Sequence, residues 1–431
     1  MNINPKESSA LLTALQGGVV PSVGIQHITV GRDDESQSVI DSLNSVALGN
    51  NDVKFWIGDF GSGKSFMIRL IETLALRKNF VVTTADFTPD TRMYSNDGKA
   101  VLLYQKLIDQ LATQTNQSGN ALPAILEQWI ERIMGTVGQK RGLSFDDLQL
   151  PENQSIVSDE IIRELSSLSS VGSFEFGQAV AKYYEGYASD NVELQKAAIR
   201  WLRGEYTAKS DSRRDLGIRE IVNDQNYYDM LKNFAAFFVQ LGYQGFVINF
   251  DEVINLYNIV QSQVRDKNYE KILSIYNDCL QNKTSHLYIN FAGTRKLLED
   301  ERRGLFSYNA LKTRLQSDEF VSSHRNLSQP VIYLPVLGSD EIFVLLSKLK
   351  EVFESNYGIK ISMSHEQIAK FMAGYLNRPG ANEHLTPREV TRGFLQLLNI
   401  LRQHPETSVD TLLSDSTESE SSSSHNDVEI L

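Results

Sequence analysis

The sequence is poor in cysteine and has no long hydrophobic run. Its single cysteine, Cys279, excludes an intramolecular disulfide and a thiolate metal site, and the apolar, helix-like run around it predicts a packing role. The seven histidines form no HxH or HxxxH pair, which argues against a transition-metal site. No apolar run approaches the ~20 residues of a membrane-spanning helix, and the N-terminus lacks the segments of a signal peptide. We expect a cytoplasmic protein without a membrane partner.

The length of the chain limits the number of domains, and its net charge limits how it could bind nucleic acid. At ~150 residues per domain, 431 residues predict two or three units. The net charge is -12, and the last residues, 406–431, contain seven acids and no lysine or arginine. We expect this Ser-rich acidic tail to be disordered. The remaining chain carries about -5, which argues against a protein coated with phosphate contacts but leaves room for a local basic groove.

Five short, continuous apolar runs predict strands, and helical periodicity fills the sequence between them. Such runs are typical of parallel strands that are buried on both faces. Alternating strands and helices predict a three-layer α/β fold. The stretch 91–244 lacks comparable strands and predicts a helical insertion, and helical patterns return after residue 338. The predicted strands cover residues 53–57, 80–87, 246–250, 287–293 and 331–336.

A glycine-rich segment, GDFGSGKS at Gly58–Ser65, matches the pattern G-x-x-x-x-G-K-[ST] between a predicted strand and a predicted helix. The glycines let the backbone turn tightly so that successive N–H groups point at phosphate oxygens, and the following helix adds its positive N-terminus. Lys64 would reach the terminal phosphates, and the Ser65 hydroxyl would bind magnesium. The alternative is a chance match in a glycine-rich turn. The pattern predicts ATP and Mg²⁺ as ligands, with nucleotide contacts from Gly58, Gly61, Ser62, Gly63, Lys64, Ser65 and Phe66.

Two adjacent acids, Asp251 and Glu252, end the predicted strand 246–250. Ligands of parallel sheets sit at the carboxyl ends of the strands. Asp251 would hold magnesium, usually through water, and Glu252 would polarise the attacking water. The alternative is a strand that ends in an acidic helix cap. Together with the phosphate loop, the pair predicts an ATPase.

The motifs divide the chain into predicted segments. The N-terminal part of the P-loop ATPase domain covers 1–90, and its C-terminal part covers 245–337. The helical insertion covers 91–244, a helical lid covers 338–405, and the disordered tail covers 406–431.

With these motifs, the sequence resembles an AAA+ ATPase with the layout of the initiator and loader branch. VGRDDE at 30–35 is similar to the N-terminal box of that branch near the adenine, and QPVIYLPVLGSDEIFVLL at 329–346 to the fifth strand leading into the lid. The resemblance implies an AAA+-like parallel sheet with a helical lid. Arg32 in the first box either reaches the nucleotide or is a surface or capping residue.

The same resemblance assigns three further site residues. LYINFAGT at 287–294 is similar to a sensor strand, which makes Thr294 a sensor, with Asn290 as the alternative. YNALKTRL at 308–315 is similar to the box of an arginine finger, which makes Arg314 the finger; the alternative is a surface arginine. A finger acts on the nucleotide of a neighbour and so implies a homo-oligomer. The last of these motifs, TPREVTRGFLQLL at 386–398, is similar to a second sensor helix, where Arg388 competes with Arg392 or is a cap residue.

More narrowly, the chain resembles the BREX system ATP-binding proteins of bacterial phage defence (BrxD-like). The similar stretches span about 20–403, and they are IGDFGSGKSF, WLRGEY, GYQGFVINFDE, FAGTR, RRGLFSYNALKTRL and LTPREVTRGFLQLLN. This resemblance implies ATP-driven remodelling or switching in anti-phage defence, with a helicase or DNA-modifying partner. Two alternatives are a DNA-loading or helicase-regulating ATPase outside defence and a non-motor signalling switch.

A basic segment at 200–219 is the best candidate for DNA contact. Trp201 and Tyr206 are interleaved with its cations, as in surfaces that bind nucleic-acid phosphates. The alternative is a solvated face of a helical region. The cations are Arg200, Arg203, Lys209, Arg213, Arg214 and Arg219.

Overall fold

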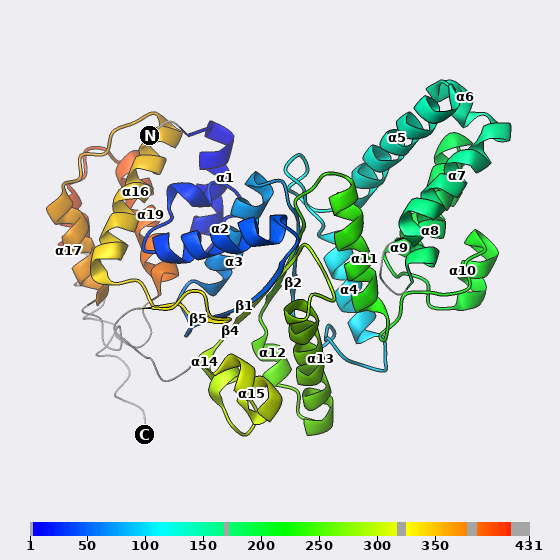
Figure 1. The fold of residues 1–431 in the computed structure, drawn as a ribbon. Helices are drawn as coiled ribbons and strands as arrows, with labels where there is room; N and C mark the ends of the chain where they lie inside the picture. Colours follow the sequence, from blue (N-terminus) through cyan, green and yellow to red (C-terminus); the bar gives the residue numbers. More distant parts are fainter. Residues whose placement is uncertain (1–2, 168–171, 317–324, 377–385, 415–431) are drawn as a thin grey trace, which may run out of the picture. The chain divides into compact units, whose positions relative to one another are not determined.

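The computed structural model describes residues 3–167, 172–316, 325–376 and 386–414 (Figure 1). They belong to two compact units. The P-loop unit lies within Met1–Gln37, Gly58–Leu70 and Tyr333–Leu431, and the sheet unit within Ser38–Ile57 and Ile71–Ile332. This division groups the phosphate loop with the first and last described segments of the chain. Apart from the start of the tail, the domain limits expected from the sequence stay predictions.

A five-stranded sheet has the strand order β2-β3-β4-β1-β5, in which β1–β4, β4–β3 and β3–β2 pair in parallel. The predicted α/β class with a parallel sheet is confirmed. The predicted last strand, 331–336, ends at Tyr333, since Pro335 has no N–H for a ladder bond. The strands are β1 (Asn51–Ile57), β2 (Val81–Asp86), β3 (Phe246–Asp251), β4 (Leu287–Gly293) and β5 (Val331–Tyr333).

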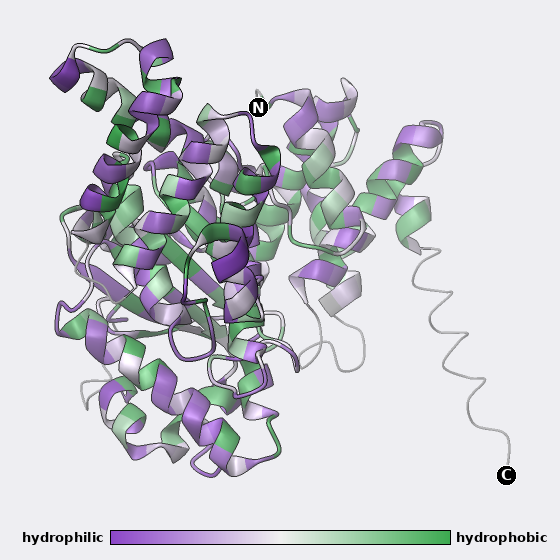
Figure 2. Cartoon of the chain, turned by 90° about the vertical axis from the view of Figure 1, so that its right-hand side faces the viewer, coloured by the Kyte–Doolittle hydropathy of each residue, from purple (hydrophilic) through white to green (hydrophobic). Residues whose placement is uncertain are grey.

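The middle of the sheet is buried because its strands are apolar on both faces. Every residue of β3 and β4 is buried. Helices α4 (Lys99–Asp109), α11 (Tyr227–Gln240) and α13 (Ser262–Leu280) pack against β2, β3 and β1, respectively. Hydrophobic and hydrophilic bands alternate along the helices (Figure 2), as expected for helices with one apolar face. Cys279 is buried in α13, and burial raises its thiol pKa to about 12, which supports the predicted packing role.

Between β2 and β3, the described residues form eight helices and no strand. The helical periodicity of 91–244 is confirmed for these residues, and 168–171 lie outside them. Besides α4 and α11, the helices are α5 (Leu122–Arg141), α6 (Phe145–Gln149), α7 (Pro151–Ser166), α8 (Ser173–Ala188), α9 (Val192–Leu202) and α10 (Lys209–Leu216).

An aromatic cluster joins α5, α8 and α11. The Phe176 ring meets the rings of Phe234 and Phe237 edge-on, with centroids 5.0 and 5.6 Å apart. Trp129 meets Phe237 in the same way at 5.4 Å. All four side chains are fully buried. Such pairs add about 0.5–1.5 kcal/mol each beyond their buried area, so this cluster helps to hold α5, α8 and α11 together.

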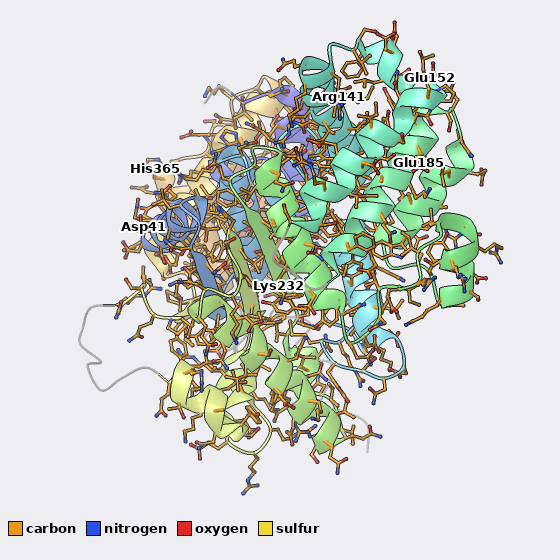
Figure 3. The ribbon with its side chains drawn as sticks, turned by 45° about the vertical axis from the view of Figure 1, so that its right-hand side comes forward. Asp41, Arg141, Glu152, Glu185, Lys232 and His365 are labelled. Atoms are coloured by element: carbon orange, nitrogen blue, oxygen red, sulfur yellow. The ribbon has the colours of Figure 1, made fainter. Side chains whose placement is uncertain are left out.

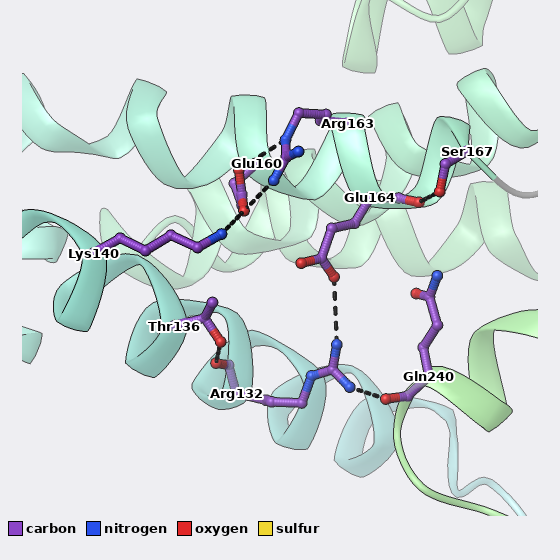
Figure 4. Close-up of polar contacts among 8 residues, drawn as sticks. All are labelled: Arg132, Thr136, Lys140, Glu160, Arg163, Glu164, Ser167 and Gln240. Carbon is purple, nitrogen blue, oxygen red and sulfur yellow. Dashed lines mark hydrogen bonds and ion pairs between the residues drawn. The ribbon is translucent and has the colours of Figure 1, made fainter.

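Charged side chains cover the outside of the same helices. Figure 3 labels Arg141, Glu152 and Glu185 on α5, α7 and α8. In Figure 4, Glu160 of α7 bridges Lys140 of α5 at 2.9 Å and Arg163. Hydrogen bonds from these two cations lower the pKa of Glu160. Exposed ion pairs contribute little to stability, so these contacts add little to the packing of α5 against α7.

The P-loop unit is built around one apolar core shared by α1 (Pro5–Gln16), α16 (Ser339–Tyr357), α17 (His365–Leu376) and α19 (Pro387–Gln403). Phe66, which follows the phosphate loop, packs against this core. Val409 and Leu413 are buried in it. The predicted disordered tail therefore begins too early at 406, because these two side chains have an apolar surface to cover; residues 415–431 lie outside the described part.

The described residues also include two longer helices and five short ones. Among the described residues, no helix is long and apolar enough to cross a membrane. These elements are η1 (Ile25–His27), α2 (Asp33–Ala47), α3 (Lys64–Arg77), α12 (Ile254–Tyr257), α14 (Arg295–Glu299), η2 (Leu305–Ser307) and α15 (Asn309–Leu315).

Candidate nucleotide-binding site

The loop at 58–65 has a backbone that requires glycine for two different reasons. Gly61 and Gly63 have φ of +81° and +86°, in the left-handed region that disfavours residues with a Cβ. At Gly58, a Cβ would lie 3.0 Å from the carbonyl oxygen of Leu334. A Cβ at Gly61 would also lie 2.9 Å from the methyl group of Thr386. The loop is therefore a tight cradle whose shape fits the predicted phosphate-binding role.

Lys64 starts α3 and reaches back over the loop. Its Nζ donates hydrogen bonds to the carbonyl oxygens of Gly58 at 2.9 Å and Asp59 at 2.8 Å. The first N–H groups of a helix have no partner within the helix and attract anions. Ser65 lies in this first turn and is half-buried. The cation and the hydroxyl thus come from the first two residues of the helix, as phosphate and Mg²⁺ binding would need.

Ser62 has a buried polar group without a partner. The residue is 1% exposed, and its Oγ has no hydrogen-bond partner among the described residues. Most buried hydroxyls in proteins are paired, and an orphan calls for an explanation. A ligand bound in the loop would explain this orphan hydroxyl, because Ser62 lies within the glycine cradle.

Arg32 lies beneath the loop, not on the surface. It is 3% exposed, and its Nη2 donates to the carbonyl oxygens of Ser62 at 2.8 Å and Pro335 at 2.7 Å. Its Nη1 lies 3.7 Å from Oε1 of the equally buried Glu35. The surface interpretation of Arg32 is wrong because the guanidinium has carbonyl and carboxylate partners inside the unit. The i,i+3 spacing of Arg32 and Glu35 in the sequence could have indicated this ion pair.

The start of α19 meets the phosphate loop. Thr386 caps this helix by accepting from the N–H of Glu389 at 3.3 Å, and its methyl group faces Gly61 as described above. Arg388 is the second residue of α19, and its aliphatic stem packs near Gly18, where a Cβ would lie 3.8 Å from Cδ. Arg392 is exposed one helical turn farther on. Arg388 therefore lies in the first turn of α19, next to the capping residue Thr386 that faces the loop. Arg392 lies one turn farther from the loop.

In the sheet unit, Asp251 and Glu252 occupy the end of β3 in contrasting environments. Asp251 is 9% exposed, and its Oδ1 accepts from the N–H of Glu252 at 2.8 Å. Glu252 is exposed and has φ of +53°. A non-glycine residue in this region costs of order 1–3 kcal/mol, and such residues cluster at functional sites. The backbone thus turns sharply between a buried and an exposed carboxylate.

Thr294 lies at the same edge of the sheet. It follows β4, whose last residue pairs with Ile57, the last residue of β1. The N–H of Val253 donates to the carbonyl oxygen of Ala292 at 3.3 Å, which sets the acidic pair beside the end of β4. Thr294 also caps α14, because its Oγ1 accepts from the N–H of Leu297 at 3.2 Å. The structure therefore brings Asp251, Glu252 and Thr294 to neighbouring strand ends.

Asn290, the alternative sensor, lies inside the sheet. It is fully buried, accepts from Nε1 of Trp56 at 2.9 Å and donates to Oδ1 of Asn249 at 3.0 Å. Asn249 in turn donates to Oγ1 of Thr84 at 3.2 Å. These contacts form a row across four strands, which gives Asn290 a structural role.

We expect Asn290→Ala to lower the free energy of unfolding by about 3 kcal/mol, because it leaves a cavity and strands the buried partners of its amide, Trp56 and Asn249. Urea denaturation would measure the change. Asn44→Ala is the matched control, since Asn44 is exposed and its amide oxygen accepts from Lys78; its effect should stay within about 0.5 kcal/mol. Equal midpoints for the two variants would contradict the role of the row.

Arg314 is exposed on α15. Its Nε donates to Oδ1 of Asn277 at 2.9 Å, and its Nη1 to the carbonyl oxygen of Ala310 at 2.8 Å. These contacts hold the guanidinium against α13 and its own helix. An exposed position is required of an arginine finger that acts on a neighbouring subunit. A surface arginine without such a role is exposed as well, so both interpretations fit.

The aromatic residues of the segment 200–219 are core residues. Trp201 donates from Nε1 to the carbonyl oxygen of Glu220 at 2.9 Å, and Tyr206 donates to Asp215 at 3.0 Å. Both are buried, and burial raises the Tyr206 pKa to about 12. They are therefore not placed to stack on bases. Several of the cations are ion-paired, as in Arg203–Asp109, Lys209–Glu220 and Arg214–Asp211.

One family of known proteins matches almost the whole described chain. The family is described as BREX system ATP-binding protein BrxC/D, and its model matches residues 3–417. No curated protein matches the chain. The matched range includes the phosphate loop, the acidic pair and α19, so the resemblance to the BREX system ATP-binding proteins is confirmed. The chain belongs to the BREX system ATP-binding proteins of the BrxC/D family.

Proposed function

We propose that the chain binds ATP with Mg²⁺ at Gly58–Ser65 and hydrolyses it. The observation that carries the proposal is the glycine cradle, closed by Lys64 at the start of α3. Its backbone N–H groups and Lys64 would hold the phosphates, and Ser65 would contribute its hydroxyl to Mg²⁺. Membership of an ATP-binding family supports the nucleotide.

The topology of the sheet supports a catalytic role for the acidic pair. From β1 the chain continues to β2 on one side of the sheet, and from β4 it continues to β5 on the other side. In open α/β sheets, ligands bind outside the carboxyl ends of the strands at such a switch point. Gly58 is the next residue after β1, Thr294 the next after β4, and Asp251 the last of β3. We propose that Asp251 and Thr294, at the ends of β3 and β4, act as catalytic residues of the ATPase.

The two carboxylates suit different tasks in hydrolysis. Asp251 is buried and held by a backbone N–H, which suits a fixed ligand of Mg²⁺ through water. Glu252 is exposed on a strained turn, which suits a base that polarises the attacking water. Thr294 keeps its hydroxyl proton for donation while its oxygen caps α14. We assign it the sensor role.

We further propose an AAA+-like arrangement with a helical lid. Right-handed crossovers in opposite directions from β1 and β4 favour helices on both faces of the sheet. Arg388 is our choice for the lid sensor, because the cap of its helix touches Gly61.

We assign Arg314 as a finger that acts in trans and makes the active form a homo-oligomer. Arg314→Ala and Lys64→Ala should each be inactive alone, but a mixture should regain ATPase activity, because intact Arg314 from one variant serves the intact loop of the other. Phosphate release from the mixture would measure this. In wild type, activity per chain should rise with protein concentration. A mixture no more active than the sum of its parts, or a flat dependence in a verified monomer, would reject the trans role.

For the biological role, we propose ATP-driven remodelling or switching in BREX defence with a helicase or DNA-modifying partner. The family description supports the defence setting. Light scattering with ATP, with and without duplex DNA, tests assembly and DNA contact together. We expect ATP-dependent assembly, and a monomer under every condition would count against remodelling by an oligomer.

A further inference from the structure

The Arg32 guanidinium holds one particular peptide of the phosphate loop. Its Nη2 donates to the carbonyl oxygen of Ser62 at 2.8 Å, and a Cβ on Gly63 would lie 3.7 Å from the same nitrogen. The guanidinium therefore lies directly against the Ser62–Gly63 peptide. Because a trans peptide is planar, its C=O and N–H point in opposite directions. A carbonyl fixed on Arg32 turns the Gly63 N–H to the opposite side.

We propose that Arg32 is a positioning residue for phosphate binding, which orients and polarises the Gly63 N–H from behind. This inference rests on the proposed function of the loop. Gly63 has φ of +86°, and glycine can adopt several backbone conformations there at little cost. A charge-assisted bond to its preceding carbonyl selects one of them before a ligand arrives. Hydrogen bonds in a chain also polarise one another, which makes the N–H a better donor to phosphate.

The surroundings of Arg32 explain how a buried cation can do this. Glu35, 1% exposed, lies 3.7 Å from Nη1 and balances the charge. Nη1 also donates to the carbonyl oxygen of Gly31 at 3.1 Å, and Nη2 to that of Pro335 at 2.7 Å. The planar fork of arginine can serve several carbonyls and a carboxylate together, which an ammonium cannot match. The Ser62 peptide is thus tied to the segment that follows β5.

The backbone at this corner is shaped to hold the arginine. Gly31 has φ of +63°, and a Cβ there would collide with the carboxylate of Glu341. Glu341 accepts from the N–H of Gly338 at the start of α16 at 2.6 Å. The position of residue 31 is therefore fixed by α16, and Arg32 extends from it to the loop.

The test uses inorganic triphosphate beside ATP, because triphosphate probes the phosphate cradle alone. Arg32→Lys should bind both roughly 10- to 100-fold more weakly than wild type, the value of one charge-assisted hydrogen bond. A single variant can lose binding by unfolding, since it disturbs the buried ion pair of Arg32 with Glu35. The double variant Arg32→Met/Glu35→Met removes both charges together, a change that buried pairs often tolerate.

We expect the double variant to melt cooperatively and to show the same loss for ATP and triphosphate. Free guanidinium ion should partly restore triphosphate binding to Arg32→Ala, whereas ammonium should not. Wild-type affinity in the folded double variant, or a loss for ATP without a loss for triphosphate, would overturn the role of Arg32 and leave the proposed ATP site intact. If wild type binds neither ligand, the proposed function itself fails.

Discussion

Lys64→Ala should weaken ATP binding by at least about 100-fold, because it removes a cation whose charge-assisted bonds to phosphate are worth ~1.5–3 kcal/mol each. The ammonium lies over the loop and already bonds two of its carbonyl oxygens, at Gly58 and Asp59. Phosphate oxygens would replace these partners when ATP binds. Equilibrium titration with ATP in Mg²⁺ measures the affinity.

The control for this variant is Arg77→Ala. Arg77 is an exposed cation at the other end of the same helix, α3, so its removal changes the net charge equally. It should leave ATP affinity within about twofold, as for a screened surface charge. Full affinity in a folded Lys64→Ala protein would reject the phosphate-binding assignment of Gly58–Ser65.

Glu252→Gln should keep ATP binding and lower the hydrolysis rate by about 10²–10⁴-fold, the usual contribution of a general base. The amide has the size of the carboxylate but cannot accept the proton of the attacking water. Phosphate release under saturating ATP measures the rate. Glu299→Gln, an exposed carboxylate paired with Arg295 on α14, is the control and should retain the wild-type rate.

A second variant separates function from stability at this position. Glu252→Gly relieves a φ of +53°, so its free energy of unfolding should not fall below that of wild type, whereas hydrolysis should be lost. If Glu252→Gly leaves the fold intact but stops hydrolysis, the strained glutamate serves catalysis and not stability. Wild-type turnover in either variant would remove Glu252 from the mechanism.

Local sequence pattern predicted most of the fold. All five strands were expected, because buried parallel strands are continuous apolar runs and need no partner to be recognised. The phosphate loop was also expected, since glycine and lysine spacing within eight residues determines its shape. The strand order, by contrast, depends on contacts between distant segments.

The residues whose roles the sequence left open or misplaced depend on such distant contacts. Arg32 is buried because Pro335, 303 residues away, supplies a carbonyl partner. Asn290 has its amide matched by Trp56 and Asn249 from two other strands. Leu413 is folded because the core of the P-loop unit covers it. None of these partners can be recognised from the residue's own neighbours.

The most direct test of an ATP-hydrolysing site is a single-turnover experiment with excess protein, Mg²⁺ and labelled ATP. Wild type and Glu252→Gln are compared for bound nucleotide and released phosphate in the same samples. We predict that both proteins retain the nucleotide and that only wild type converts it to ADP and phosphate. Equal conversion by the two proteins, or no nucleotide retained by either, would contradict the account.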